Sequence, residues 1–392
     1  MALRLHVSEE HENFLQCLDE IGPVLRENAE KGEELGQLTE EAERALRDSG
    51  AFRTSIPASL GGYELSPVQH IEAVERIARE DASAGWAYMA VQASTGTTAA
   101  WLGEAAVREL YPNVPSGDHA LMAGQGTKLG QAVPTEGGYR ISGHWMFASG
   151  ISMATHIHTA AQCTETGKPL VFTLPKEQAE LVDNWDVMGL RATASHDYRC
   201  DDLFVPSSHV YEMTAFEVHH GGAIYRMGMA DMACLCHTGW ALGVGRRMLD
   251  EMREIAARKT GTPGATVDTQ QFHAEYAEAE ARLRAARAWV REVWSDNEAA
   301  LDRGEALTTE QETLARTSLH NATWSVHAVG QTVYKWAGTA ALRRGALQRY
   351  FRDLHAGTQH VTSGPAVLQS CGKWLSGLAP ESQWVFLELQ ES

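Results

Sequence analysis

The stretch of sequence that decides the fold is Arg349-Tyr350-Phe351-Arg352-Asp353-Leu354-His355-Ala356-Gly357-Thr358-Gln359-His360, close to the C-terminus. Its spacing predicts a helix that begins with a basic residue and carries an Arg-Asp pair and two histidines. His355 lies on a different face from His360, because neighbours on one helix face are three or four positions apart. We interpret His355 as structural and keep His360 as a candidate functional residue.

The chain on both sides of this stretch continues the helical pattern. From about Met213 onward an apolar helical period indicates a bundle of long helices with short connections. The long helices are expected at residues 222–258, 268–302, 308–337 and 343–373. Pro263-Gly264 and Gly304 separate them, and Thr308 with Gln311 marks a capping-box start.

The first 115 residues are also predicted to be helical. A helix is expected from about Ser8 to Leu35, and further helices begin at Thr39, at Ser66 and at about residue 83. Ser66 suits an N-cap, and Gln69 stands where a capping-box partner belongs.

The middle of the chain has a different pattern. Between Ala120 and Pro206 there are short runs rich in β-branched residues. Glu136-Gly137-Gly138 and Glu165-Thr166-Gly167-Lys168 read as the turns of hairpins. The sequence therefore predicts a mainly α fold with a small β domain. Its expected parts are an N-terminal helical domain (1–115), a β domain (116–212) and a C-terminal bundle (213–392).

Composition narrows the class of protein. The chain has 392 residues and a formal charge of −18, which argues against nucleic acid or an anionic membrane as the main partner. The six cysteines show no disulfide rhythm, which favours a reducing cytoplasm. The N-terminal region lacks the apolar segment of a signal peptide, and no run is long enough for a membrane span. We expect a cytoplasmic protein.

Several segments, in this order, carry a resemblance to a known family. They are Gly50-Ala51-Phe52 with Gly61-Gly62, then Gly143 to Gly150, Gly189 to Ser195, and Leu347 to Asp353. Together they resemble the acyl-CoA dehydrogenase family over almost the whole chain. The resemblance implies an N-terminal helical domain, a central β-barrel, a C-terminal four-helix bundle and a homotetramer.

Two departures from the dehydrogenase pattern indicate a particular branch of the family. Dehydrogenases place a carboxylate base nine residues after the arginine of the Arg-Asp pair, and that position here is Val361. The neighbouring His360 resembles the histidine of the flavin monooxygenases of this fold. In Phe147-Ala148-Ser149-Gly150, Phe147 replaces the tryptophan and Ser149 the threonine that dehydrogenases set against flavin N5. The resemblance therefore implies that Ser149 bonds the flavin and that His360 is catalytic.

The same resemblance assigns further residues to the site. Phe147, Arg258, Gly338 and Thr339 would contact the cofactor, with Arg258 on the flavin pyrophosphate. Tryptophans are candidates for an apolar substrate pocket: Trp86, Trp145 and Trp240. Taken alone, each has an ordinary explanation, because tryptophans are mostly core residues and Arg258 suits the C-terminal end of a helix.

Cys234-Leu235-Cys236-His237 suggests a metal site. It lies within an apolar helical stretch and lacks a second paired cluster, so we expect no metal.

The function implied is that of the oxygenase component of a two-component flavin-dependent monooxygenase. Reduced flavin, either FAD or FMN, would come from a separate reductase, because no Gly-x-Gly-x-x-Gly motif follows a strand to hold NAD(P)H. Oxygen would add at flavin C4a to give a hydroperoxide, which an aromatic or indolic substrate attacks while His360 serves as base.

Other functions remain open on the sequence. One is a flavin desaturase or dehydrogenase with an unusual base, and another is an N- or S-oxygenase on the same fold. A third is a non-catalytic flavin- or lipid-binding protein.

Overall fold

The structure is a computed structural model that describes residues 9–214 and 217–391. The N-terminal helices are α1 (Glu9–Leu35), α2 (Glu40–Asp48), α3 (Pro67–Glu80), α4 (Ala82–Trp101) and α5 (Glu104–Leu110). Ser8, where the first helix was expected to start, lies outside the described residues. The capping box of α3 is confirmed, because Ser66 accepts from the Gln69 N–H and the Gln69 side chain accepts from the Ser66 N–H.

The β domain follows as a mixed sheet. Its strands are β1 (Met122–Thr135), β2 (Gly138–Trp145), β3 (His156–Cys163), β4 (Pro169–Pro175), β5 (Glu180–Val182), β6 (Asp197–Pro206) and β7 (Val210–Glu212). They pair in the order β5-β6-β2-β1-β3-β4-β7, with β1 and β3 parallel. The two expected hairpins are confirmed, and each has a glycine with positive φ in its turn, Gly137 and Gly167.

The C-terminal part is the bundle. Its helices are α6 (Gly228–Lys259), α7 (Gln270–Asp302), α8 (Thr309–Ala337), α9 (Ala346–Gly357) and α10 (Pro365–Leu375), followed by a hairpin of β8 (Ser382–Val385) and β9 (Glu388–Glu391). The capping box at Thr308 and Gln311 is confirmed. The mainly α fold class with a small β domain is likewise confirmed. The borders drawn between the three domains stay predictions.

One expected helix is wrong. The pattern predicted a single helix over residues 343–373, whereas the chain leaves the helix after Gly357 and starts α10 at Pro365. Gly364 and Pro365 explain the restart, because proline is favoured at the first position of a helix. His360 lies in the break between the two helices, as the N-cap of a short 3₁₀ turn, η9 (Val361–Ser363).

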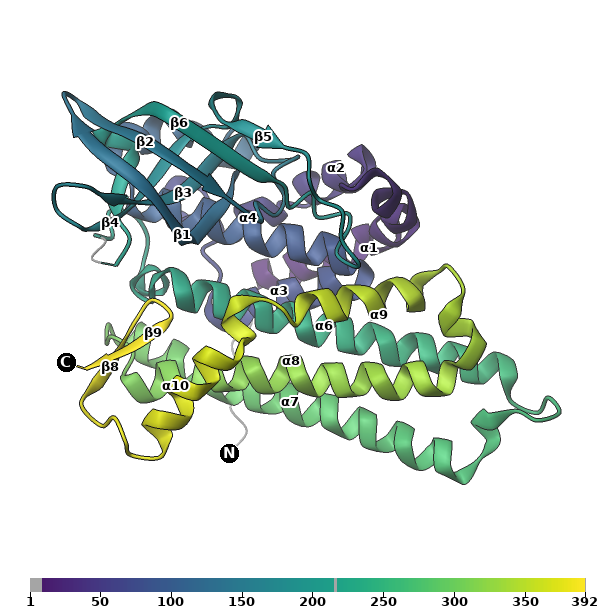
Figure 1. Cartoon of the computed structure of the whole chain (residues 1–392). Helices are drawn as coiled ribbons and strands as arrows, with labels where there is room; N and C mark the ends of the chain where they lie inside the picture. The colour runs from purple at the N-terminus through teal and green to yellow at the C-terminus, as the bar shows by residue number, and fades with distance from the viewer. Residues whose placement is uncertain (1–8, 215–216, 392) are drawn as a thin grey trace.

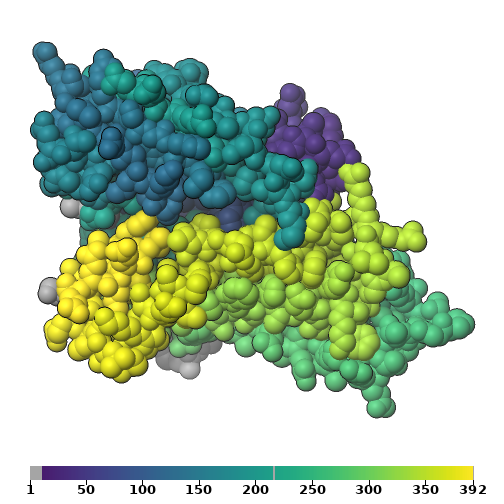
Figure 2. Space-filling view, in the orientation of Figure 1, coloured from purple at the N-terminus to yellow at the C-terminus, as the bar shows by residue number. Residues whose placement is uncertain are grey.

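The parts stack in layers. Figure 1 shows the sheet lying over α4, with α3, α6 and α9 below it and α8 and α7 farther away. Figure 2 shows the C-terminal segment meeting the β domain along a seam on one face of the molecule. Within residues 9–214 and 217–391, no helix is both long and apolar enough to cross a membrane.

Candidate active site

Helix α9 holds the loop between β5 and β6 in place. The backbone N–H of Leu190 donates to Oδ1 of Asp353 at 2.6 Å, and Nη1 of Arg352 donates to the Met188 carbonyl at 2.8 Å. A Cβ on Gly189 would lie 2.2 Å from the Arg352 carbonyl oxygen, so only glycine permits this close approach. Burial raises the pKa of the Asp353 carboxyl to about 7.

Trp86, on α4, joins the two residues that were expected to be functional. Its indole N–H donates to the Ser149 hydroxyl at 3.1 Å, and its ring lies 5.4 Å from the ring of His360. His237 and Trp240 on α6 pack edge-on against the same indole, with ring centroids 5.2 and 4.9 Å away. Ser149, His360, Trp86 and Trp240 are therefore brought together by the fold.

Ser149 is also the end of a row of hydroxyl groups. Its Oγ lies 2.7 Å from Oγ of Ser195, which lies 2.6 Å from Oγ1 of Thr193. The Thr193 hydroxyl donates to the Leu190 carbonyl at 2.8 Å. The row therefore runs from Trp86 back to the turn that Asp353 holds.

His360 is an uncharged imidazole in this setting. Burial lowers its pKa to about 4. Its Nδ1 lies 2.7 Å from the Thr362 hydroxyl and also accepts from the Thr362 backbone N–H at 3.4 Å. The break between α9 and α10 therefore supplies both the histidine and the groups that orient it.

His237 belongs to the cluster and was not expected there. Its ring lies 4.6 Å from that of His360, and its Nδ1 lies 3.1 Å from the same Thr362 hydroxyl. Burial is the main cause that lowers the pKa of His237 well below its ordinary value, and the neighbouring His360 lowers it further. The sequence signal was present in Cys234-Leu235-Cys236-His237, but it was considered only as a metal motif. The Cys236 sulfur instead accepts from the Gln92 amide at 2.9 Å.

Phe147 stands next to the cluster in an unusual conformation. It has a φ of 65° and is 58 % exposed, although it is large and apolar. A non-glycine residue with positive φ is strained, and such strain gathers at ligand sites. The exposed ring is available to a planar ligand beside Ser149.

Trp145 is not part of the cluster, so its role in a substrate pocket stays a prediction. Its ring stacks on Tyr198 at 5.3 Å, and its indole N–H donates to the Ala160 carbonyl at 2.9 Å. Trp145 is the last residue of β2, and its side chain is fully buried. Trp240 is also fully buried, but it belongs to the cluster because its ring packs against Trp86. Its indole N–H donates to the Ala82 carbonyl.

The other expected cofactor residues lie at the far end of the bundle. Arg258 is exposed near the end of α6 and pairs with Glu254 at 3.7 Å. Gly338 and Thr339 follow α8 directly, and Lys259 reaches the Ala337 carbonyl beside them. The length of α9, roughly 18 Å, separates this end from His360. Within one chain these residues do not join the cluster, so their flavin contacts stay predictions.

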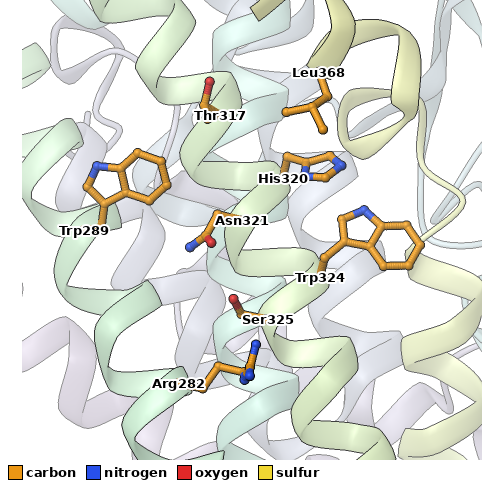
Figure 3. Close-up of a pocket in the computed structure, with 8 residues that line it drawn as sticks. All are labelled: Arg282, Trp289, Thr317, His320, Asn321, Trp324, Ser325 and Leu368. Carbon is orange, nitrogen blue, oxygen red and sulfur yellow. The ribbon is translucent and has the colours of Figure 1, made fainter. Parts of the chain in front are cut away.

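A hollow lies on the bundle, away from the cluster. Its volume is about 430 Å³, and Figure 3 shows the side chains that α7, α8 and α10 contribute to it. The lining residues are Arg282, Trp289, Thr317, His320, Asn321, Trp324, Ser325 and Leu368. None of them belongs to the cluster around Trp86.

The residues of the cluster fit a flavin. Trp86, Ser149, Ser195, His237 and His360 are all uncharged at neutral pH, which suits a planar, mostly apolar ring system with polar edge atoms. Ser149 offers a small hydroxyl at the edge of this aromatic surface.

Comparisons with known proteins place this geometry in a family. The model for the acyl-CoA dehydrogenase N-terminal domain matches residues 8–117, and that for the C-terminal domain matches residues 235–364. The oxygenase subunit HsaA, a flavin-dependent monooxygenase of Rhodococcus jostii, is 27 % identical over 90 % of this chain and 94 % of its own. An indole-3-acetate monooxygenase of Acinetobacter baumannii is 27 % identical over 93 % and 94 %.

A solved structure agrees with these relatives. The 3-HSA hydroxylase of Rhodococcus sp. RHA1 superimposes with a TM-score of 0.87 at 26 % identity, covering 94 % of this chain and 98 % of that one. The chain belongs to the acyl-CoA dehydrogenase family. Within that family it is one of the flavin-dependent monooxygenases, an oxidoreductase.

Proposed function

We propose that the protein is the oxygenase component of a two-component system that hydroxylates an aromatic or indolic small molecule with reduced flavin and oxygen. The observation that carries the proposal is the single indole of Trp86, which contacts both Ser149 and His360. Relatives aligned over nearly their full length are named for this class of reaction, and one is named for an indolic substrate.

The residues take distinct roles in this proposal. Ser149 hydrogen-bonds the flavin at N5, with Phe147 against its ring. His360 faces the substrate, as base or as the group that orients it. Bound reduced flavin, FAD or FMN, would supply the oxygen chemistry. The buried aromatic surroundings of Trp86 and Trp240 exclude water, which such chemistry requires.

The remaining cofactor contacts imply more than one copy of the chain. Arg258, Gly338 and Thr339 lie a helix length away from His360. We propose that they contact the flavin of another subunit, within a homotetramer. A separate reductase that supplies the reduced flavin, and a cytoplasmic location, complete the proposal.

The first experiment mixes the protein anaerobically with reduced FAD or FMN and then with oxygenated buffer. We expect near-ultraviolet absorbance that persists before the absorbance of oxidised flavin appears. Immediate appearance of oxidised flavin, with and without aromatic substrates, would instead favour a flavin dehydrogenase activity. Ser149→Ala is expected to shorten the delay, and an unchanged delay would remove Ser149 from the mechanism.

A further inference from the structure

The row of hydroxyl groups behind Ser149 has a direction that its two ends determine. One end is the indole N–H of Trp86, which can only donate, 3.1 Å from Ser149 Oγ. The other end is the Leu190 carbonyl, which can only accept. It takes the Thr193 hydroxyl at 2.8 Å and the indole N–H of Trp185 at 3.0 Å.

Each hydroxyl between these ends has one proton to donate. Thr193 donates its proton to the Leu190 carbonyl, so in the 2.6 Å hydrogen bond between Thr193 and Ser195 the donor must be the Ser195 hydroxyl. The Ser195 proton is then committed, so Ser149 must donate across the 2.7 Å contact to Ser195. Ser149 therefore has no proton left for a ligand, but its oxygen keeps a free lone pair.

The burial of the row preserves this direction. Thr193 and Ser195 are each 1 % exposed and Ser149 is 9 % exposed, so water has little access with which to replace a lost partner. Turning the Ser149 hydroxyl toward a ligand would force Ser195 and Thr193 to turn with it. The Leu190 carbonyl would then lose the Thr193 hydroxyl, the shortest of its hydrogen bonds, and keep the longer ones from the Trp185 indole at 3.0 Å and the Thr193 backbone N–H at 3.2 Å.

We propose that Ser195 and Thr193 are positioning residues that hold Ser149 as a hydrogen-bond acceptor, so that the site selects reduced over oxidised flavin. Reduced flavin carries a proton on N5 and is a donor there, whereas N5 of oxidised flavin has only a lone pair. This inference rests on the proposed function, in which Ser149 meets flavin N5. In a two-component system it would let the oxygenase take up the product of the reductase and release the spent cofactor.

The Leu190 end of the row is anchored by α9. The backbone N–H of Leu190 is bonded to Asp353 on α9, and the added Trp185 contact steadies its carbonyl. A row fixed at both ends holds its direction better than a single serine would.

The test measures the dissociation constants of reduced and oxidised FAD, and of FMN, for the full-length protein under anaerobic conditions. In Ser195→Ala the Ser149 hydroxyl loses its acceptor and becomes free to donate. We expect oxidised flavin to bind on the order of five- to tenfold tighter, while the affinity for reduced flavin changes little. Thr193→Val should shift the ratio in the same direction, because Ser195 can then donate to Ser149.

Thr193→Ser is the matched control, because it keeps the hydroxyl and should keep the wild-type ratio. A purely structural role would weaken both redox forms together in Ser195→Ala and Thr193→Val, and that result would overturn the inference. Equal affinity of the wild-type protein for both forms would overturn it as well, while leaving the proposed function intact. Failure of the wild-type protein to bind either form would overturn both.

Discussion

The Thr362 hydroxyl lies 2.7 Å from Nδ1 of His360, and the Thr362 backbone N–H points to the same nitrogen. A backbone N–H can only donate, so Nδ1 of the neutral His360 ring carries the lone pair and Nε2 carries the proton. The Thr362 hydroxyl then donates to His360 and accepts from Nδ1 of His237 at 3.1 Å. In this form His360 offers an N–H to the site, which favours orienting a substrate oxygen over taking up its proton.

We therefore expect His360 to be in the Nε2–H tautomer in the resting protein. Nitrogen-15 chemical shifts of the histidine rings report the tautomer directly. Thr362→Val removes the hydroxyl at nearly constant shape and should lower product formation about tenfold, through the loss of one hydrogen bond to the ring. Thr362→Ser should retain both the tautomer and the activity. A proton on Nδ1 in the wild-type spectrum would refute this assignment.

Removal of His360 should separate flavin binding from hydroxylation. His360→Ala is expected to bind reduced flavin as the wild-type protein does but to lose most product formation, because its ring faces Trp86 in the cluster. His355→Ala is a suitable control. His355 contacts Gln331 on α8 and the Phe351 carbonyl on its own helix. Hydroxylation by His360→Ala at the wild-type rate would exclude a catalytic role.

The pH dependence of hydroxylation should reflect the burial of His360. Its pKa is lowered to about 4, so the ring is neutral at pH 7 and gains a proton only as the pH falls through about 4. The contribution of His360 is therefore expected to be constant between pH 5 and 8. A limb near pH 6.5 that disappears in His360→Ala would show that the ring titrates as an exposed histidine does.

The order of the helices and strands was predictable because each part of the chain has its own spacing of apolar residues and its own capping or turn residues. Ser66 with Gln69 and Thr308 with Gln311 marked helix starts that depend only on local hydrogen bonds. The break that contains His360 was not predicted. The apolar pattern continues across it, and only Gly364-Pro365 signals the restart.

The site was predictable only where a resemblance supplied it. Ser149 and His360 come from segments more than 200 residues apart, and their meeting at Trp86 depends on tertiary packing. The sequence did not show that Trp145 lies apart from Trp86, because alternation along a strand does not say which face of the sheet is buried. His237 was overlooked because its partner, the Thr362 hydroxyl, comes from a segment 125 residues later in the chain.

Asp353 should make stability depend on pH. Its pKa in the folded protein is about 7, above the ordinary 3.8, so the folded state favours the protonated carboxyl. The corresponding stability is complete below about pH 4 and is lost as the pH rises through 7. Asp353→Asn keeps an acceptor for the Leu190 N–H and should remove this slope, whose upper bound is about 4 kcal/mol.

Urea unfolding of both proteins between pH 4 and 8 measures this difference. Asp201→Asn, at an exposed position of the β domain, is the matched control and should leave the slope unchanged. Parallel curves for the wild-type protein and Asp353→Asn would mean that Asp353 is ionised throughout.

Gly357, at the end of α9, should tolerate no side chain. A Cβ there would lie 2.1 Å from the indole of Trp240, which is fully buried and tied to the Ala82 carbonyl. Gly357→Ala is expected to lower the free energy of unfolding by about 1–3 kcal/mol and to displace Trp86, which packs on Trp240. Gly372→Ala, in α10 with open space around the added Cβ, should instead raise stability by about 0.5–1 kcal/mol. Equal stability of the two variants in urea would contradict this packing of Trp240 against α9.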